Sequence, residues 1–336
     1  MKLREFIFSK KYENNHKVVN FMGIKFKIRR KKQDKKITFL NNTNIEPIYV
    51  SRCPLCGEEH YYFIKEYDIN NLIQKWENQF SLNPISNCYR DKILQRRECS
   101  KCGLQYYNYG IPDTKEMYSH LYSMHKTYYS KNKWEYDIAL QFVKKYNPQA
   151  VMDIGCGAGY FLEKLINVVP DLLGQEFNPK AFADADSRLG GGKITSDSLK
   201  QIKKKFDIIF SFQVFEHVNK PEEFIEDVLN LLNKNGYLVL STPNPDSALI
   251  RNCPGILELP PHHCIDVTKS AFEYIAKEYN LEIIEYLESE MEFWEWKNYM
   301  KAKYNTDVNI NSHYCEYLKE RNQLTGKTHM VCFKKR

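Results

Sequence analysis

The feature that most restricts the fold of this chain is a glycine-rich loop at residues 155–159, between an apolar stretch and an amphipathic one. The segment before it, 151–154, reads Val-Met-Asp-Ile, and the segment after it, 160–168, repeats apolar side chains at helical spacing. Three glycines in five residues allow a sharp turn from a strand into a helix. This order predicts a strand, a loop and a helix of a parallel α/β sheet, with a ligand bound at the loop.

Two common ligand classes do not fit the spacing of these glycines. A dinucleotide-binding loop reads Gly-x-Gly-x-x-Gly, and Tyr160 stands where its last glycine would be. A nucleoside-triphosphate loop ends in Gly-Lys, and this loop contains no such pair. The pattern that remains is an acid, Asp153, at the end of an apolar strand, followed by Gly155-x-Gly157-x-Gly159.

This arrangement resembles the class I S-adenosylmethionine-dependent methyltransferases. The resemblance implies an α/β domain with a Rossmann-like seven-stranded methyltransferase sheet, and S-adenosylmethionine at the glycine loop. Asp153 matches the acid that holds the loop and the amino group of the cofactor, while the small side chain of Cys156 fits a crowded turn. The residues expected to contact the cofactor are Asp153, Gly155, Cys156, Gly157, Gly159, Glu176, Asp197 and Gln213.

The later apolar stretches follow the strand order of that family. Glu176 ends the next stretch, 19 residues after the middle glycine, where the resemblance implies a carboxylate that binds both ribose hydroxyls. Asp197 ends the following stretch and matches a residue near the adenine amino group. Gln213 comes after the expected fourth strand, at the edge where open α/β sheets bind ligands. Stretches 282–286 and 329–333 resemble the closing hairpin of the family, whose last strand is antiparallel.

Two cysteine pairs precede this domain. Cys53-Pro-Leu-Cys56-Gly and Cys99-Ser-Lys-Cys102-Gly share one spacing, and four sulfurs on two tight turns suit tetrahedral Zn²⁺. The sequence shows no secretory signal and no apolar stretch that could span a bilayer, so we expect a cytoplasmic protein with reduced thiols. We therefore expect a structural zinc site in a zinc-ribbon-like module. Such a module has a structural or recognition role and not a catalytic one, because protein ligands take all four positions on the metal.

Positive charge is concentrated at the N-terminus. Residues 1–36 contain 13 Lys and Arg and 3 acidic residues, so with a formal net charge of +7 the rest of the chain is mildly acidic. Such a segment either binds phosphate, on anionic lipid or nucleic acid, or is a solvated tail. Residues 8–28 also resemble a short segment of some bacterial surface-glycan enzymes, which implies a peripheral position at the inner membrane face. A nucleic-acid partner is disfavoured, because the catalytic half has no basic stripe.

Two histidine motifs follow the expected fourth and fifth strands. Glu216-His217 resembles a motif of the branch that contains quinone O-methyltransferases and sugar methyltransferases, and Pro260-Pro261-His262-His263 resembles a segment of polysaccharide-cluster methyltransferases. A hydroxyl acceptor needs a base, and imidazole suits that task near neutral pH. The catalytic candidates are His217, His263 and Glu216, which either orients His217 or helps to hold a metal. The structural alternatives are that Glu216 and His217 cap a helix and that His263 belongs to a Pro-Pro turn.

A zinc module joined to this methyltransferase resembles enzymes that methylate sugars. We therefore expect O-methylation of a sugar of a surface polysaccharide, or of its nucleotide- or lipid-linked precursor, with a sugar or glycan as the acceptor. Transfer to the carbon of a nucleotide-linked sugar is the nearest alternative. Methylation of RNA or a quinone, and a scaffold that binds the cofactor without using it, are the others.

The sequence divides into four regions. They are a basic N-terminal segment at 1–45, a zinc-binding module at 46–112, a helical linker at 113–148 and the methyltransferase domain at 149–336. Alternating side chains within the first region predict two short strands with a turn near Met22 and Gly23.

Overall fold

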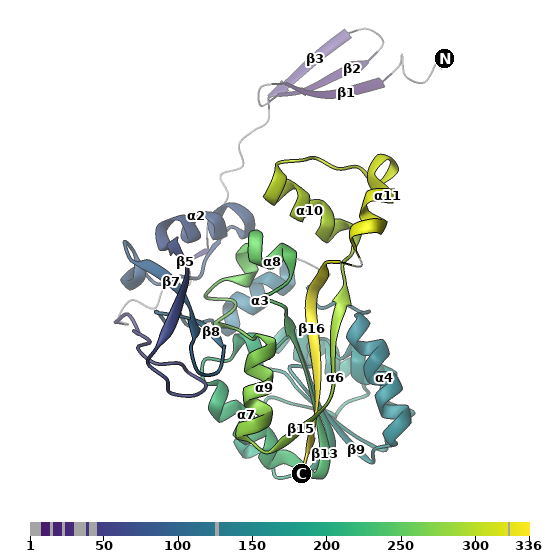
Figure 1. The fold of residues 1–336 in the computed structure, drawn as a ribbon. Coiled ribbons are helices and arrows are strands. Elements are labelled where there is room, and N and C mark those ends of the chain that lie inside the picture. The colour runs from purple at the N-terminus through teal and green to yellow at the C-terminus, as the bar shows by residue number, and fades with distance from the viewer. Residues whose placement is uncertain are drawn as a thin grey trace. The chain divides into compact units, whose positions relative to one another are not determined.

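The computed structural model describes residues 8–13, 16–21, 24–29, 38–39, 46–124, 128–321 and 323–336. The chain forms two units, residues 1–37 and 38–336. In the first unit, antiparallel strands pair in sequence order (Figure 1): β1 Phe8–Glu13, β2 His16–Phe21 and β3 Ile24–Arg29. The sequence predicted two strands here, and the predicted turn at Met22 and Gly23 lies outside the described residues.

A seven-stranded sheet forms the centre of the second unit (Figure 1). Its order is β11-β10-β9-β12-β13-β16-β15, and every neighbouring pair is parallel except the two that involve β16. The strands are β9 Ala150–Ile154, β10 Asp171–Gln175, β11 Ile194–Thr195, β12 Phe206–Phe212, β13 Leu232–Pro243, β15 Leu281–Glu290 and β16 Thr325–Lys335. The Rossmann-like sheet expected from the sequence is confirmed, including its antiparallel last strand.

Helices cover both faces of this sheet. Adjacent residues of a strand point to opposite faces, so a strand with consecutive apolar residues needs a helical layer on each side. Met152 of β9 packs into one core with α7 and α9, and its neighbour Val151 packs into the other with α4, α5 and α6. These helices are α4 Trp134–Tyr146, α5 Tyr160–Leu165, α6 Pro179–Arg188, α7 Pro221–Leu231 and α9 Lys269–Glu278. The loops at the carboxyl ends of the strands are left to form a site.

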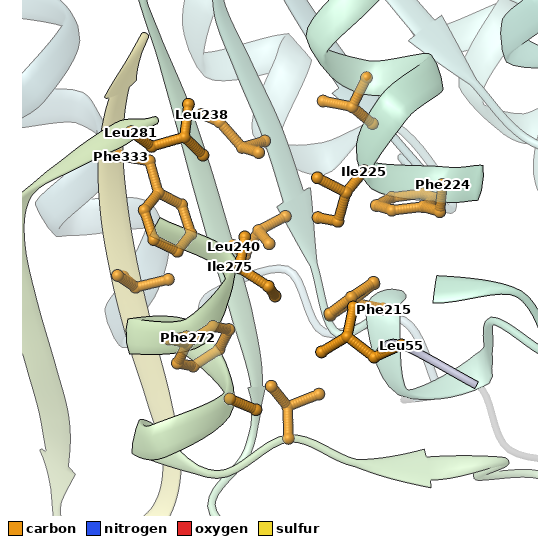
Figure 2. Close-up of a cluster of buried hydrophobic side chains, with 14 of the residues drawn as sticks. Leu55, Phe215, Phe224, Ile225, Leu238, Leu240, Phe272, Ile275, Leu281 and Phe333 are labelled. Carbon is orange, nitrogen blue, oxygen red and sulfur yellow. The ribbon is translucent and has the colours of Figure 1, made fainter. Parts of the chain in front are cut away.

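The cysteine pairs belong to a smaller antiparallel sheet that includes a strand from the methyltransferase half. Its order is β14-β8-β7-β5. The strands are β5 Tyr61–Asp68, β7 Ile93–Cys99, β8 Gln105–Tyr107 and β14 Ile265–Asp266. Leu55, from the turn between Cys53 and Cys56, lies in the same buried cluster as Phe215 and Phe272 (Figure 2). Residues 46–112 and 149–336 therefore share a sheet and a core.

The remaining elements connect or extend these parts. Two helices between β15 and β16 form an insertion that the sequence analysis did not predict, and Trp296 and Tyr317 bury against Leu249 of α8. The helices are α2 Ile69–Phe80, α3 Lys115–Met124, α8 Ala248–Asn252, α10 Phe293–Tyr304 and α11 Ile310–Glu320, and the short strands are β4 Thr38–Phe39 and β6 Leu82–Asn83. Short 3₁₀ turns occur at η1 Asn87–Tyr89, η2 Leu199–Gln201, η3 Phe215–His217 and η4 Ile256–Glu258. Among the described helices, none has the length and apolar character needed to cross a membrane.

Candidate active site

The glycine loop joins β9 to α5 at the carboxyl edge of the large sheet. Gly155, Gly157 and Gly159 have positive φ angles of 67°, 55° and 76°, in a region that residues with a side chain avoid. A Cβ atom on Gly157 would lie 2.6 Å from the ring of Tyr129. Glycine is therefore required for this turn, and it leaves loop backbone facing the adjacent cavity.

Two buried carboxylates flank the loop. Burial raises the pKa of Asp153 to about 8, against the opposing positive charge of Lys133. The carboxylate of Glu176 accepts the backbone N–H groups of Gly157 at 2.9 Å and Asn178 at 2.6 Å. Burial raises the pKa of Glu176 as well, and these backbone donors oppose the rise. Glu176 therefore fixes the loop and also lines the cavity.

One cavity of about 1030 Å³ contains the glycine loop and the predicted histidines. This volume is at the upper end of the range of roughly 300–1,000 Å³ for small-molecule sites, so the cavity has room for a cofactor and an acceptor. The predicted cofactor residues that line it are Asp153, Gly155, Cys156, Gly157, Glu176 and Gln213.

Two predicted cofactor residues do not line the cavity. A Cβ atom on Gly159 would lie 3.1 Å from the Cβ of Ala185 in α6, so this glycine allows close helix packing. Asp197 is exposed, and its backbone carbonyl accepts a hydrogen bond of 3.1 Å from Nε2 of Gln175. The next residue, Ser198, lines the cavity. The contact between Asp197 and adenine stays a prediction.

Three of the histidines that line the cavity lie next to one another. Ring centroids lie 4.6 Å apart for His217 and His262, 4.9 Å for His217 and His263, and 4.8 Å for His262 and His263. Nδ1 of His217 donates a hydrogen bond to the backbone carbonyl of His262. The backbone N–H of Cys264 donates to the carbonyl of Glu216 at 2.8 Å. These two bonds join the loops that follow β12 and β13, so the candidates His217, His263 and Glu216 come together.

The electrostatics of this group follow from its burial. Burial lowers the pKa of His217 to about 4, although the His262 carbonyl opposes the shift. Burial also lowers the pKa of His262 and of His263 far below the usual value. It raises the pKa of the Glu216 carboxyl to about 8. The imidazoles are therefore neutral near pH 7, the form that accepts a proton or binds a metal ion.

Three further residues at this site were not predicted from the sequence. Tyr128 donates its hydroxyl hydrogen bond of 2.7 Å to Nε2 of His262. Lys133 lines the cavity, and its charge opposes the raised pKa values of Asp153 and Glu216. Glu135 accepts a hydrogen bond of 3.3 Å from Nε2 of Gln213. These residues lie in or next to the predicted helical linker and belong to no recognisable motif, so only the fold brings them to the site.

The four paired cysteines lie together, away from this cavity. Their sulfur atoms are all within 4.8 Å of one another. Sulfurs of Cys53 and Cys102 are 3.5 Å apart, and those of Cys56 and Cys99 are 3.4 Å apart. Four thiolates about 2.3 Å from one zinc ion would be spaced by roughly 3.8 Å, so the set fits tetrahedral Zn²⁺. The cysteines do not line the cavity, which agrees with a structural site.

Comparison with known proteins places these features in a family. A model described as a methyltransferase domain matches residues 98–286. A ubiquinone biosynthesis O-methyltransferase of Pelagibacter ubique is 31% identical over 100 residues, which cover 28% of this chain and 42% of the relative. A tRNA U34 carboxymethyltransferase of Aeromonas hydrophila is 30% identical over 122 residues, which cover 33% of this chain and 37% of the relative. This chain therefore spans about two fifths of the length of these curated relatives.

One solved structure that this chain matches is a SAM-dependent methyltransferase from Archaeoglobus fulgidus. The match has 19% identity and a TM-score of 0.42, and it covers 60% of this chain and 94% of that chain. The family model alone covers more than half of the chain, from the second cysteine pair through the glycine loop to β15. The chain therefore belongs to the methyltransferase-domain family and contains a class I methyltransferase domain.

Proposed function

We propose that this protein transfers a methyl group from S-adenosylmethionine to a hydroxyl group of a sugar. The acceptor is a sugar of a surface polysaccharide, or of its nucleotide- or lipid-linked precursor. The main support is that one cavity joins the glycine loop to a cluster of neutral imidazoles. The Pro-Pro-His-His segment at 260–263, and the combination with two cysteine pairs, support the choice of a sugar.

The residues of this chain supply alignment and a proton acceptor. Asp153, Glu176 and the loop backbone would hold the methyl donor, and Lys133, which lines the same cavity, would pair with its carboxylate. Because Nδ1 of His217 donates to a backbone carbonyl, Nε2 is the nitrogen that carries the lone pair. The acceptor hydroxyl gives its proton to this nitrogen while its oxygen attacks the methyl carbon. The carbon–sulfur bond breaks, and S-adenosylhomocysteine leaves.

The cavity lining suits a sugar better than a flat apolar acceptor. Tyr118 and Phe177 offer aromatic faces, while Asp113, Glu258 and Gln79 offer acceptors and donors for hydroxyl groups. A quinone is the second candidate acceptor, because a curated relative is named for ubiquinone biosynthesis and the phenolic hydroxyl would need the same proton acceptor. Transfer to a sugar carbon would require the same base.

The test is methyl transfer by the full-length protein with labelled S-adenosylmethionine and separate pools of nucleotide sugars, lipid-linked glycans, quinone precursors and RNA. We expect label in a sugar fraction, and fragmentation of the product separates oxygen from carbon transfer. His217→Gln should lower turnover by about 10²-fold or more with little change in the affinity for S-adenosylhomocysteine. Label only in quinone or RNA would contradict the proposed acceptor.

We also propose that the four cysteines bind structural Zn²⁺ and that the protein acts in the cytoplasm, with its basic segment near anionic lipid. The matched spacing of the two cysteine pairs and the convergence of their sulfurs support the metal. The charge of residues 1–36 supports the lipid contact. RNA is a less favoured partner, because the basic excess is confined to this segment.

A further inference from the structure

The histidine cluster contains more groups than a single proton transfer needs. One nitrogen from each of His217, His262 and His263 lies within 4.8 Å of the others. Zinc-bound nitrogens in a tetrahedral site are about 3.4 Å apart, since each Zn–N bond is about 2.0–2.1 Å. Side-chain shifts of about an ångström would bring the three nitrogens to that spacing, and all three residues line the cavity.

Backbone carbonyls orient two of these rings as they orient metal ligands. Nδ1 of His217 donates to the carbonyl of His262, and Nδ1 of His262 donates to the carbonyl of Leu257 at 2.8 Å. Each bond fixes the tautomer in which Nε2 carries the lone pair. Metal-binding histidines commonly use their second nitrogen in this way, which directs the first one at the ion.

Two buried polar atoms beside these rings have no hydrogen-bond partner among the described residues. They are Nδ1 of His263 and Oε2 of Glu216, and the two residues are 6% and 1% exposed. The other carboxylate oxygen of Glu216 lies 3.9 Å from Nε2 of His217. Unpaired buried nitrogen and oxygen atoms destabilise a fold unless something binds them. A cation at the cluster would satisfy the lone pairs of all these groups.

We propose that His217, His262 and His263 bind a second divalent transition-metal ion, with Glu216 beside it, on the acceptor side of the cavity. Three imidazoles and a carboxylate favour Zn²⁺, and Co²⁺, Fe²⁺ or Ni²⁺ fit the same donors. This site would differ from the four-cysteine site, because three protein ligands would leave one tetrahedral position open and all three residues line the cavity. Tyr128 shares Nε2 of His262 at 2.7 Å, so its hydroxyl competes with the ion for that nitrogen.

The ion would activate the acceptor, and this step rests on the proposed function. A hydroxyl bound to a divalent ion loses its proton more easily, because the positive charge stabilises the alkoxide. Nε2 of His217 would then be a ligand. The nearby cation would favour the ionised form of Glu216, and its carboxylate would take the proton in place of His217. The acceptor oxygen attacks the methyl carbon, the carbon–sulfur bond breaks, and S-adenosylhomocysteine leaves.

The test counts metal ions on the full-length protein after growth with Co²⁺, by elemental analysis and visible absorption. We expect two ions per chain: one with the thiolate-to-metal charge-transfer band of the cysteine site, and one with only the weaker ligand-field bands of nitrogen and oxygen donors. His263→Gln should remove one ion and the weaker bands while the thiolate band stays. The control His120→Gln changes a histidine outside the cluster, bonded to the carbonyl of Phe80, and should keep both ions.

A second variant separates metal binding from a structural role of the cluster. Tyr128→Phe removes the competing hydroxyl, so the second ion should bind at least as tightly, whereas a purely structural cluster would bind none in either protein. One ion per chain in the unaltered protein, or two ions in both His263→Gln and His262→Gln, would overturn the proposal. One ion with full methyl transfer would leave the proposed function standing. Two ions with no transfer to any acceptor would overturn that function and keep the metal site.

Discussion

At the scale of single residues, Gly157 combines a backbone requirement with a steric one. Its φ angle is 55°, and an added Cβ atom would lie 2.6 Å from Tyr129, whose ring faces the cavity. We predict that Gly157→Ala weakens binding of S-adenosylhomocysteine by roughly tenfold or more, because strain of about 1–3 kcal/mol falls on the loop that holds the ligand. Isothermal titration measures this change.

The chain provides a control with the same strain and no steric conflict. Gly191 has a φ angle of 83°, and an added Cβ atom would meet nothing within 4 Å. Gly191→Ala should cost a similar amount of folding stability and leave the affinity for S-adenosylhomocysteine unchanged. Equal losses of affinity in both variants would show that general destabilisation, and not strain in the glycine loop, weakens the binding of S-adenosylhomocysteine.

A pH dependence of stability belongs to His329, a buried residue outside the histidine cluster. Its Nε2 is 2.8 Å from Oγ1 of Thr242 and its Nδ1 is 3.0 Å from the hydroxyl of Tyr286. Burial lowers the pKa of His329 to about 4, against the attraction of Asp246. Below pH 6.5 the unfolded state therefore binds a proton that the folded state does not, and stability falls with pH down to about 4.

We predict that His329→Gln removes this contribution. The free energy of unfolding of the unaltered protein should fall between pH 7 and pH 5 by about 2 kcal/mol more than that of the variant. Urea unfolding of both proteins at the two pH values checks the difference, and the other buried histidines cancel because both proteins contain them. Parallel stability curves would mean that His329 binds the proton equally in the folded and unfolded states, which would contradict the lowered pKa.

The residues that could be predicted from the sequence are those with a local signal. The glycines and Asp153 follow one another in the chain, and their spacing alone predicted a cofactor loop. Tyr128 carries no such signal, because its role depends on a hydrogen bond to His262, which is distant in the sequence. His262 is part of the Pro-Pro-His-His motif, but its contribution depends on the orientation of its ring, which only the fold determines.

At the scale of elements, β14 connects the cysteine module to the histidine cluster. It begins two residues after His263 and pairs with β8, where Ile265 lies opposite Tyr106. The hydroxyl of Thr268 donates to the carbonyl of Gly103, directly after the last cysteine of the module, at 2.9 Å. The strand order of the large sheet could be predicted from successive apolar stretches. This pairing could not, since it joins segments about 160 residues apart.

A buried ion pair strengthens the same connection. Nε of Arg96 lies 3.0 Å from Oδ2 of Asp266, and the hydroxyl of Tyr107 donates to that oxygen at 3.1 Å. Because both charged groups are buried, each depends on the other for its solvation. Unfolding of the cysteine module should therefore also disturb the loop that carries His262 and His263.

We predict that Cys99→Ser lowers the zinc content by one ion per chain and the free energy of unfolding by more than about 3 kcal/mol, because metal binding and folding of such a module are coupled. Methyl transfer should fall further than the affinity for S-adenosylhomocysteine, since β14 adjoins the acceptor side. Cys253→Ser is the control, because Cys253 is exposed and outside the cluster. Unchanged zinc and stability in Cys99→Ser would rule out the zinc site.

At the scale of the whole molecule, the excess of basic residues and the cavity belong to different units of the chain. Residues 1–37 form a unit of their own, and residues 1–36 carry the basic excess, while the unit that contains the cavity belongs to the mildly acidic remainder. This division follows from composition and could be predicted from the sequence. Under the proposed function, surface attraction belongs to one unit and methyl transfer to the other, so the two proposals can be tested independently.

We predict that the full-length protein binds vesicles rich in anionic lipid, and that binding weakens as salt is added. Replacing Lys31, Lys32, Lys35 and Lys36 with Gln should reduce the vesicle affinity by about fivefold for each lysine, since each contributes about 1 kcal/mol near a charged surface. The matched control replaces Lys200, Lys203, Lys204 and Lys205, which lie in the second unit. Co-sedimentation measures the binding.

Equal losses of vesicle affinity in both variants would indicate a nonspecific effect of net charge. A loss confined to the N-terminal variant, with unchanged methyl transfer to a soluble acceptor, would assign residues 1–36 to the membrane surface.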